Sequence, residues 1–313
     1  TTSQLLNAHT RNWDPLIFSA LNLPIHIMAP VIQPGQKIGA ITPELERETG
    51  LTNIQVVTVG NHDTASAVAA VPALTPHWAY LSSGTWSLLG MEVEEPVISD
   101  LSLKYGFTNE GGIGGKIRLL RNIMGLWLLQ KCRQQWNDEG KKCSYDDLVN
   151  MAEEAKPFKC IIDPNHPSFL NPSDMPAAIR AYCQHTGQPE PRSKPEMVRC
   201  IFESLAFKYR YILELIQSLT KKKIGVLHIV GGGSQNRMLN QFTANAANLH
   251  VKAGPAEAAA LGNIMVQGVV SGFPASLEEG RSLIASSFPV EMYMPEKIEK
   301  WDRVYQKCKK LFS

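Results

Sequence analysis

Short apolar runs that end in glycine and lead directly into helix-like spacing are the main pattern of this chain. The clearest run, residues 226–230, ends in Gly231-Gly232-Gly233-Ser234-Gln235-Asn236. Apolar or small residues then recur at positions 238, 239, 242, 246 and 249, which is the spacing of one helix face. A second run at 250–252 leads through Gly254-Pro255 into a helix of small residues from 256 to about 270. The pattern predicts two strand–turn–helix units of an α/β protein.

Two hairpins and several further helices follow from the same reading. Residues 78–82 and 86–91 predict apolar strands joined by Ser82-Ser83-Gly84-Thr85, and residues 105–110 and 116–120 predict a second hairpin. Thr42 and Pro43 mark the start of a short helix that Gly50 ends. The remaining helices are predicted at residues 4–22 (a pair broken at 12–15), 65–70, 124–136, 145–155, 193–219, 276–288 and 295–311.

The first segment with candidate chemistry is Gly60-Asn61-His62-Asp63-Thr64. It lies between a predicted buried strand, residues 54–59, and the helix of small residues that follows. Because α/β folds place ligands at strand-to-helix junctions, the carboxylate of Asp63 is a candidate site residue. A carboxylate at the start of a helix is equally typical of a plain N-cap. The local sequence leaves both interpretations open.

Hydroxyl, amide and glycine residues supply candidate partners for Asp63. The turn at residues 82–85 offers hydroxyl and N–H groups to a phosphate, although the same residues are typical of a surface turn. Asn122 and Gln130 would share one side of the predicted helix at 124–136 and its start, facing either a cleft or solvent. The glycines at 231–233 allow a ligand close to the backbone beside a helix start that favours anions, or they only close a tight turn.

Composition narrows the classes of function. The chain has 313 residues, 44% hydrophobic and 19% charged, with a formal net charge of +2. These values are typical of a globular protein and give no electrostatic argument for nucleic acid. No apolar run approaches the roughly 18 residues of a membrane span. Six cysteines without a C-x-x-C pattern predict reduced thiols in a cytoplasmic protein, although Cys183 and Cys200 could pair.

Four segments, taken together and in order, resemble the FGGY family of carbohydrate kinases. They are G-N-H-D-T-A-S-A-V at 60–68, L-S-S-G-T-W-S-L-L-G at 81–90, R-N-I-M-G-L-W-L-L-Q at 121–130 and I-V-G-G-G-S-Q-N at 229–236. The resemblance covers essentially the whole chain. It implies an actin-like α/β fold, in which two ribonuclease H-like domains hold ATP and a sugar between them. Within the family, the first two segments favour members that phosphorylate L-rhamnulose to L-rhamnulose 1-phosphate in rhamnose metabolism.

The resemblance also implies roles for individual residues. Asp63 is expected to be the catalytic base, and His62, Asp63, Thr64 and Asn122 are expected to contact the ketose. The expected nucleotide contacts are Thr85, Gln130, Gly231, Gly232, Gly233, Gln235 and Asn236. Mg²⁺ is expected to bridge the phosphates, held largely by phosphate and water oxygens. The expected partners are therefore a small sugar and ATP, with neither nucleic acid nor a membrane, and the oligomeric state is left open.

One departure from the family changes the expected domain organisation. The Asp-x-Gly phosphate loop with which family members begin has no counterpart here. We therefore expect residues 1–58 to end the N-terminal sugar-binding domain and residues 59–313 to form the C-terminal nucleotide-binding domain, with the last helix, 295–313, able to pack back on the first. The chain would then be a C-terminal portion that lacks most of the first domain. It would be inactive alone, because a missing N-terminal segment would complete the site.

Three other interpretations are kept open. Another kinase of the family, acting on fuculose or xylulose, differs from the favoured one only in the stereochemistry or a methyl group of its substrate. A non-catalytic actin-like protein could bind nucleotide or sugar without turnover. A dinucleotide-dependent oxidoreductase is suggested by the glycines after residue 230, but Asn236 stands where the third glycine of G-x-G-x-x-G is required.

Overall fold

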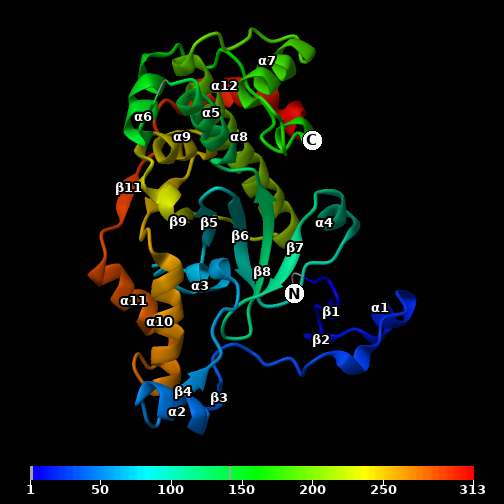
Figure 1. Ribbon diagram of the computed structural model, residues 1–313. Coiled ribbons are helices and arrows are strands. Elements are labelled where there is room, and N and C mark those ends of the chain that lie inside the picture. The colour runs from blue at the N-terminus through cyan, green and yellow to red at the C-terminus, as the bar shows by residue number, and fades with distance from the viewer. Residues whose placement is uncertain (1–2, 141) are drawn as a thin grey trace. The chain divides into compact units, whose positions relative to one another are not determined.

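The computed structural model describes residues 3–140 and 142–313 (Figure 1). The chain divides into two compact units. Unit 1 contains the described residues up to Pro76 together with Gly90–Leu120 and Glu257–Pro289. Unit 2 contains His77–Leu89, Arg121–Ala256 and Val290–Ser313. Each unit is thus built from segments that lie far apart in the sequence. Among the described residues, no helix combines the length and apolarity that crossing a membrane requires.

Unit 1 begins with a small hairpin. β1 (Leu6–Asn7) pairs antiparallel with β2 (Asn12–Trp13), and α1 (Pro15–Ala20) follows with Asp14 as its N-cap. The predicted pair of helices over residues 4–22 is therefore wrong in its first half. The side chain of Asn7 accepts hydrogen bonds from the backbone N–H groups of His9 and Thr10, which turns the chain back on itself. Such local Asn–backbone bonds compete with helix formation.

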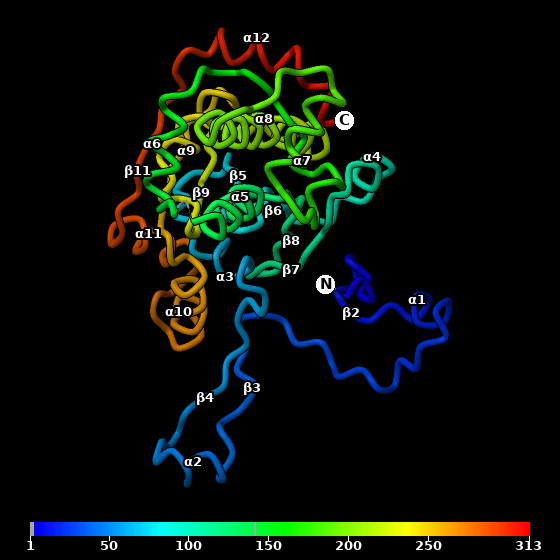
Figure 2. The backbone as a smooth tube through the Cα atoms, turned by 45° about the horizontal axis from the view of Figure 1, so that its top comes forward, coloured from blue at the N-terminus to red at the C-terminus, as the bar shows by residue number. Residues whose placement is uncertain are grey.

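A two-stranded ribbon with a short helix at its tip comes next, as Figure 2 shows. It consists of β3 (Lys37–Ala40), α2 (Pro43–Thr49) and β4 (Gln55–Val57). The predicted ends of α2 are confirmed, because Thr42 caps it and Gly50 ends it at φ 70°. The predicted buried strand at 54–59 is wrong. β4 has three residues, of which Gln55 and Val56 are exposed, because it pairs with a strand that itself buries none of its four residues.

The core of unit 1 is the crossing of α3 (Asp63–Ala69) and α10 (Ala258–Ser271). Every residue of α3 after Asp63 is buried. At Gly262 of α10, a Cβ atom would lie 1.8 Å from the carbonyl oxygen of Ser66, so the two backbones touch directly. Arg281 donates to the carbonyl oxygens of Val68 and Ala69 and thereby holds the C-terminal end of α3. The helix of small residues predicted from 256 to about 270 is confirmed as α10. Its small side chains permit the close approach to α3.

One sheet has the strand order β11, β10, β9, β5, β6, β8, β7; β7 belongs to unit 1, and β6 and β8 each contribute residues to both units. Strands β5, β9 and β10 are parallel, whereas β11 and β7 are antiparallel to their neighbours. The strand bounds are β5 Trp78–Ser83, β6 Ser87–Val93, β7 Thr108–Gly111, β8 Ile117–Ile123, β9 Val226–Val230, β10 His250–Ala253 and β11 Glu291–Tyr293. Residue Ser82 lies opposite Val230 in the register of β5 and β9. The carboxyl ends of these two strands therefore meet at one edge.

Helix α8 (Lys194–Thr220) is the centre of the helical part of unit 2 and packs on α5, α6 and α9 (Figure 1). Ser193 caps it by accepting from the N–H of Glu196, and the carboxylate of Glu196 accepts from the N–H of Arg192. The other helices are α4 Asp100–Lys104, α5 Trp127–Asp138, α6 Tyr145–Glu154, α7 Met175–His185, α9 Arg237–Ala247, α11 Leu277–Ser287 and α12 Ile298–Cys308. Short 3₁₀ turns lie at Ile25–Ile27, Pro167–Phe169, Gly232–Gln235 and Lys309–Phe312. All six cysteines are buried free thiols, so Cys183 and Cys200 are not bonded.

Candidate functional site

The N-terminus of α3 is shaped by Gly60. This residue is buried, and a Cβ atom on it would lie 2.8 Å from the backbone nitrogen of Ser66. The hydroxyl of Ser66 donates to the carbonyl oxygen of Gly60 at 2.9 Å. Only glycine permits the chain to fold this closely against the helix that it enters, and the next three residues consequently project from the helix start.

His62 and Asp63 form a linked pair at that start. The Asp63 Oδ1 atom accepts from the N–H of Thr64 at 2.7 Å and lies 3.0 Å from His62 Nδ1. The Thr64 N–H is 3.3 Å from the same Nδ1, but one nitrogen cannot donate and accept at once. Oδ1 is the nearer acceptor for the Thr64 N–H. We therefore assign a proton to His62 Nδ1, which donates a hydrogen bond to Asp63 Oδ1.

The carboxylate of Asp63 combines a fixed position with access. Its side chain is 82% exposed, and all its hydrogen bonds within the described residues use Oδ1. The other oxygen, Oδ2, is therefore open to a reacting group. The helix start holds a negative charge favourably. The sequence left open whether Asp63 is a plain N-cap or a site residue. In the structure His62 is the N-cap, and Asp63 is the first helical residue, whose Oδ2 atom is available to a ligand.

In unit 2 the carboxyl edge of β5 and β9 brings two sequence motifs together. Gly231 has φ 84°, and a Cβ atom there would lie 2.9 Å from the carbonyl oxygen of Ser83. A Cβ atom on Gly233 would lie 2.0 Å from the hydroxyl oxygen of Ser83. These two glycines are thus explained by packing against the 82–85 turn. Gly232 is different: it is exposed, its φ is not positive, and a Cβ atom on it would meet nothing within 4 Å.

The same turn is tied to helix α5. The N–H groups of Leu126 and Trp127 donate to the carbonyl oxygens of Gly84 and Thr85, at 3.2 and 3.0 Å. Gln130, one turn further along α5, is half-buried, and Thr85 is exposed. The nucleotide residues expected at positions 85, 130 and 231–233 therefore lie on elements that are joined to one another through the 82–85 turn.

Asn122 is not on a helix, contrary to the prediction. It lies in β8, which continues to Ile123, and α5 starts only at Trp127 after the turn at Gly125. A Cβ atom on Gly125 would lie 2.3 Å from the Ser87 hydroxyl, so the chain turns there against β6. The argument that Asn122 and Gln130 share one helix face is therefore wrong. Asn122 is exposed, and its side chain is available to a ligand.

Two residues that fix the site were not predicted. The side chain of Asn165 donates to the carbonyl oxygen of Asn122 and accepts from the N–H of Met124, which clamps the end of β8. The buried Asn240 donates to the carbonyl oxygen of Ser234 at 2.8 Å and fixes the glycine loop from below. Neither residue could be identified from the sequence. The partners of Asn165 lie far from it along the chain, and the bond of Asn240 to a backbone carbonyl oxygen follows no sequence pattern. The side chain of Asn236 caps α9 by accepting a hydrogen bond from the backbone N–H of Leu239. The expected contact of Asn236 with the nucleotide stays a prediction.

Within the described residues no group of three or more His, Cys, Asp or Glu side chains could hold a metal ion.

Comparison with known families corrects the expected domain organisation. The profile of the C-terminal domain of the FGGY family of carbohydrate kinases matches residues 79–271, and that of the N-terminal domain matches residues 1–70. The expectation of a C-terminal portion that lacks the first domain is therefore wrong, because residues 1–70 match that domain. The expected inactivity of the chain depends on the same reading and loses its support. The absence of the Asp-x-Gly loop does not indicate the absence of the first domain, because the Gly60–Thr64 segment itself lies within the N-terminal match. The predicted boundary at residues 58 and 59 stays a prediction.

Curated relatives share much of the sequence. Rhamnulokinase of Bacteroides thetaiotaomicron is 48% identical over 97% of this chain and 62% of its own length. The rhamnulokinases of Enterococcus faecalis and Bacillus subtilis are 41% and 39% identical, over 96% of this chain and 60% and 61% of their own lengths. The chain thus spans about 60% of the length of these relatives.

Solved structures show the fold. A gluconate kinase and a xylulose kinase from Lactobacillus acidophilus match with TM-scores of 0.74 and 0.73, each at 19% identity over 98% of this chain and 61% of theirs. Plasmodium falciparum glycerol kinase with ADP matches with a TM-score of 0.71 at 18% identity, over 98% of this chain and 60% of its own. The expected actin-like α/β fold is confirmed. Since the two domain profiles together match most of the sequence, the chain belongs to the FGGY family of carbohydrate kinases.

Proposed function

We propose that the protein transfers the γ-phosphoryl group of ATP to a ketose, with L-rhamnulose as the preferred acceptor and L-rhamnulose 1-phosphate as the product. The observation that carries this proposal is the identity of 39–48% to proteins named rhamnulokinase over nearly the whole chain. The alternative substrates fuculose and xylulose have weaker support, because the xylulose kinase structures are only 16–19% identical. ATP as the phosphoryl donor favours a cytoplasmic location.

Asp63 is the proposed general base. Its open oxygen would take the proton from the primary C1 hydroxyl of the ketose while that oxygen attacks the γ-phosphorus, and ADP would leave. His62 donates to the other oxygen of the carboxylate and Thr64 supplies a backbone N–H to it, so both hold the base in place. His62, Thr64 and Asn122 are the proposed ketose contacts. Positioning of this kind accounts for much of the rate in phosphoryl transfer.

The nucleotide would lie at the carboxyl edge of β5 and β9. The open backbone of Gly232 supports this, since neither backbone strain nor internal packing requires glycine there. The proposed contacts are Thr85, Gln130, Gly231, Gly232, Gly233, Gln235 and Asn236. Mg²⁺ bound by the phosphate oxygens and water would neutralise charge on the transferred group.

An assay of the purified protein with ATP, Mg²⁺ and a panel of ketoses tests the proposal. ADP release would be measured with L-rhamnulose, L-fuculose and D-xylulose, and the sugar phosphate would be identified by mass spectrometry. We expect the largest kcat/KM for L-rhamnulose. Nucleotide binding without a phosphorylated sugar from any of the three would indicate a non-catalytic protein, and a larger kcat/KM for another ketose would refute the assigned substrate.

A further inference from the structure

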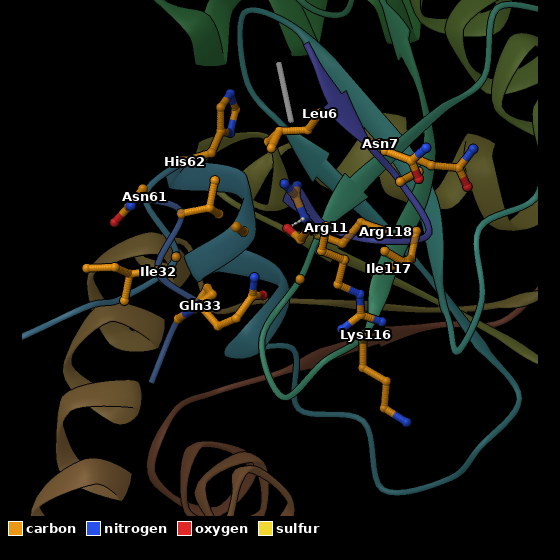
Figure 3. Close-up of a pocket in the computed structure, with 18 residues that line it drawn as sticks. Leu6, Asn7, Arg11, Ile32, Gln33, Asn61, His62, Lys116, Ile117 and Arg118 are labelled. Atoms are coloured by element: carbon orange, nitrogen blue, oxygen red, sulfur yellow. Dashed lines mark hydrogen bonds between the residues drawn. The ribbon is translucent and has the colours of Figure 1, made fainter. Parts of the chain in front are cut away.

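A cavity in unit 1 connects His62 with a buried arginine that no motif identified. The cavity has a volume of about 280 Å³, and Arg118 and His62 are among its lining residues (Figure 3). Ligand pockets usually measure about 300–1,000 Å³, so this one lies just below that range. Its size suits a monosaccharide better than a nucleotide.

Arg118 has one donor that the protein does not use. The residue is 2% exposed. Its Nη2 atom donates to Glu110 Oε2 at 2.9 Å and its Nε atom donates to the carbonyl oxygen of Gly111 at 3.1 Å. The Nη1 atom is buried and has no hydrogen-bond partner among the residues that the structure describes. A buried donor left unsatisfied costs about 1–3 kcal/mol, so a bound group that accepts from Nη1 would be favoured.

A second buried arginine–glutamate pair shows that such an arginine need not be left unsatisfied. In unit 2, Arg199 donates through Nε to Glu203 and through Nη1 to the carbonyl oxygen of Ala152. The described part of the chain offers Arg118 Nη1 no comparable acceptor. The difference between the two arginines lies in the cavity, which Arg118 lines and Arg199 does not.

Two cationic residues that line the cavity are paired with carboxylates. Arg118 is paired with Glu110, and Lys116 is paired with Glu94. These two cationic groups are thus neutralised within the protein, and Arg11 is a third cationic residue of the lining.

The cavity also has an apolar wall. Leu6, Ile32 and Ile117 line it beside the polar groups, as the labelled side chains in Figure 3 show. A ligand that matches both walls carries several hydroxyl groups and one apolar end. A 6-deoxyketose such as L-rhamnulose has this chemistry, since a methyl group replaces the hydroxyl at C6.

We propose that this cavity holds the ketose and that Arg118 is a specificity residue, whose Nη1 atom donates a hydrogen bond to a sugar hydroxyl. The inference rests on the proposed kinase function and extends the ketose contacts beyond those of the His62–Thr64 segment. Arg118 needs its pairing with Glu110 for this task, because the pair fixes the direction in which Nη1 points.

Calorimetric titration of the purified protein with L-rhamnulose, alongside the ADP-release assay, tests the inference. Arg118→Lys keeps the positive charge but loses the second arm of the guanidinium group. A hydrogen bond to a charged group is worth about 1.5–3 kcal/mol, so we expect L-rhamnulose to bind about 10- to 100-fold more weakly, with ATP affinity unchanged. Arg199→Lys, the same change in the other buried pair, should leave the affinity for L-rhamnulose unchanged.

A second variant decides the matter if Arg118→Lys does not fold. Gln33 lines the cavity and is exposed, so Gln33→Trp should obstruct the cavity without disturbing the Arg118–Glu110 pair. Gln55→Trp, at an exposed position outside the cavity, is its control. We expect only Gln33→Trp to weaken L-rhamnulose binding.

The possible outcomes separate the two proposals. A wild-type protein that turns over L-rhamnulose while Arg118→Lys and Gln33→Trp bind it normally would overturn the inference and leave the proposed function standing. A wild-type protein that neither binds nor phosphorylates any ketose would overturn both.

Discussion

The contact between α3 and α10 predicts that Gly262→Ala destabilises the protein. A Cβ atom at residue 262 would lie 1.8 Å from the carbonyl oxygen of Ser66 and 2.6 Å from its carbonyl carbon. The atoms it meets belong to the backbone of a buried helix, so no side-chain rotation relieves the clash. Real Cβ atoms are essentially never closer than 3.0 Å to such a neighbour. The helices must therefore separate by at least 1.2 Å at this point, which is the difference between 3.0 and 1.8 Å.

The magnitude follows from two opposing effects. Overpacking of a tight interior typically costs about 1–3 kcal/mol, and alanine gains about 1 kcal/mol over glycine in a helix. Because the clash is with backbone atoms, the cost should lie near the upper end of that range, and the net free energy of unfolding should fall by about 2 kcal/mol. At an unfolding entropy of about 2.1 cal/mol/K per residue, a 313-residue protein then loses about 3 °C in Tm. Because α3 carries His62 and Asp63 at its N-terminus, its displacement should also weaken ketose binding.

Gly280→Ala in α11 is the matched control. Its Cβ atom would lie 2.4 and 2.6 Å from Sδ and Cγ of Met265, whose flexible side chain can move away, and 3.2 Å from Cγ of Pro274, where a shift of a few tenths of an ångström suffices. Differential scanning calorimetry of both variants should show a clear fall in Tm for Gly262→Ala and little change for Gly280→Ala. An equal Tm for the two variants, or a Gly262→Ala protein as stable as the wild type, would refute the argument from backbone contact.

Two further predictions concern the glycine loop and a buried carboxylate. Gly232→Ala should keep Tm, since its Cβ atom would meet nothing within 4 Å, but should weaken ATP binding in calorimetry, whereas Gly233→Ala should lower Tm because its Cβ atom would lie 2.0 Å from the Ser83 hydroxyl oxygen. Loss of stability in both variants, or in neither, would contradict this contrast. Burial raises the pKa of Glu203 from 4.5 to about 7, against the partial opposing effect of Arg199. The folded protein therefore retains a proton that the unfolded chain loses, and stability should fall by up to about 3 kcal/mol as pH rises from 4.5 to 7. Glu203→Gln should flatten the plot of Tm against pH over this range, and an unchanged slope would contradict the assigned proton.

Features whose signals are local could be predicted from the sequence. The strand at residues 226–230 and the helix after its glycines were found because apolar spacing and glycine punctuation act within one segment. The ends of α2 follow from Thr42, Pro43 and Gly50 in the same way. The family resemblance carried by the four motifs is likewise a property of short segments.

Features that depend on distant partners could not be predicted. The apolar residues 54–59 fit a buried strand, but whether a strand is covered depends on what packs on it, and β4 has only the exposed β3 beside it. Asn122 was placed on a helix because its neighbours suit a helix as well as a strand, whereas β-pairing extends β8 to Ile123. The unused donor of Arg118 exists only because Glu110 and Gly111 occupy its other two nitrogens in space.

The role of Asp63 as general base is tested most directly by Asp63→Asn. Asparagine keeps the size of the side chain and can still accept from the Thr64 N–H, but it cannot take a proton from the sugar. We expect kcat with L-rhamnulose to fall by about 10²–10⁴-fold, while the Kd values for L-rhamnulose and ATP, measured by calorimetry, stay close to those of the wild type. A variant that phosphorylates L-rhamnulose at nearly the wild-type rate would contradict the account.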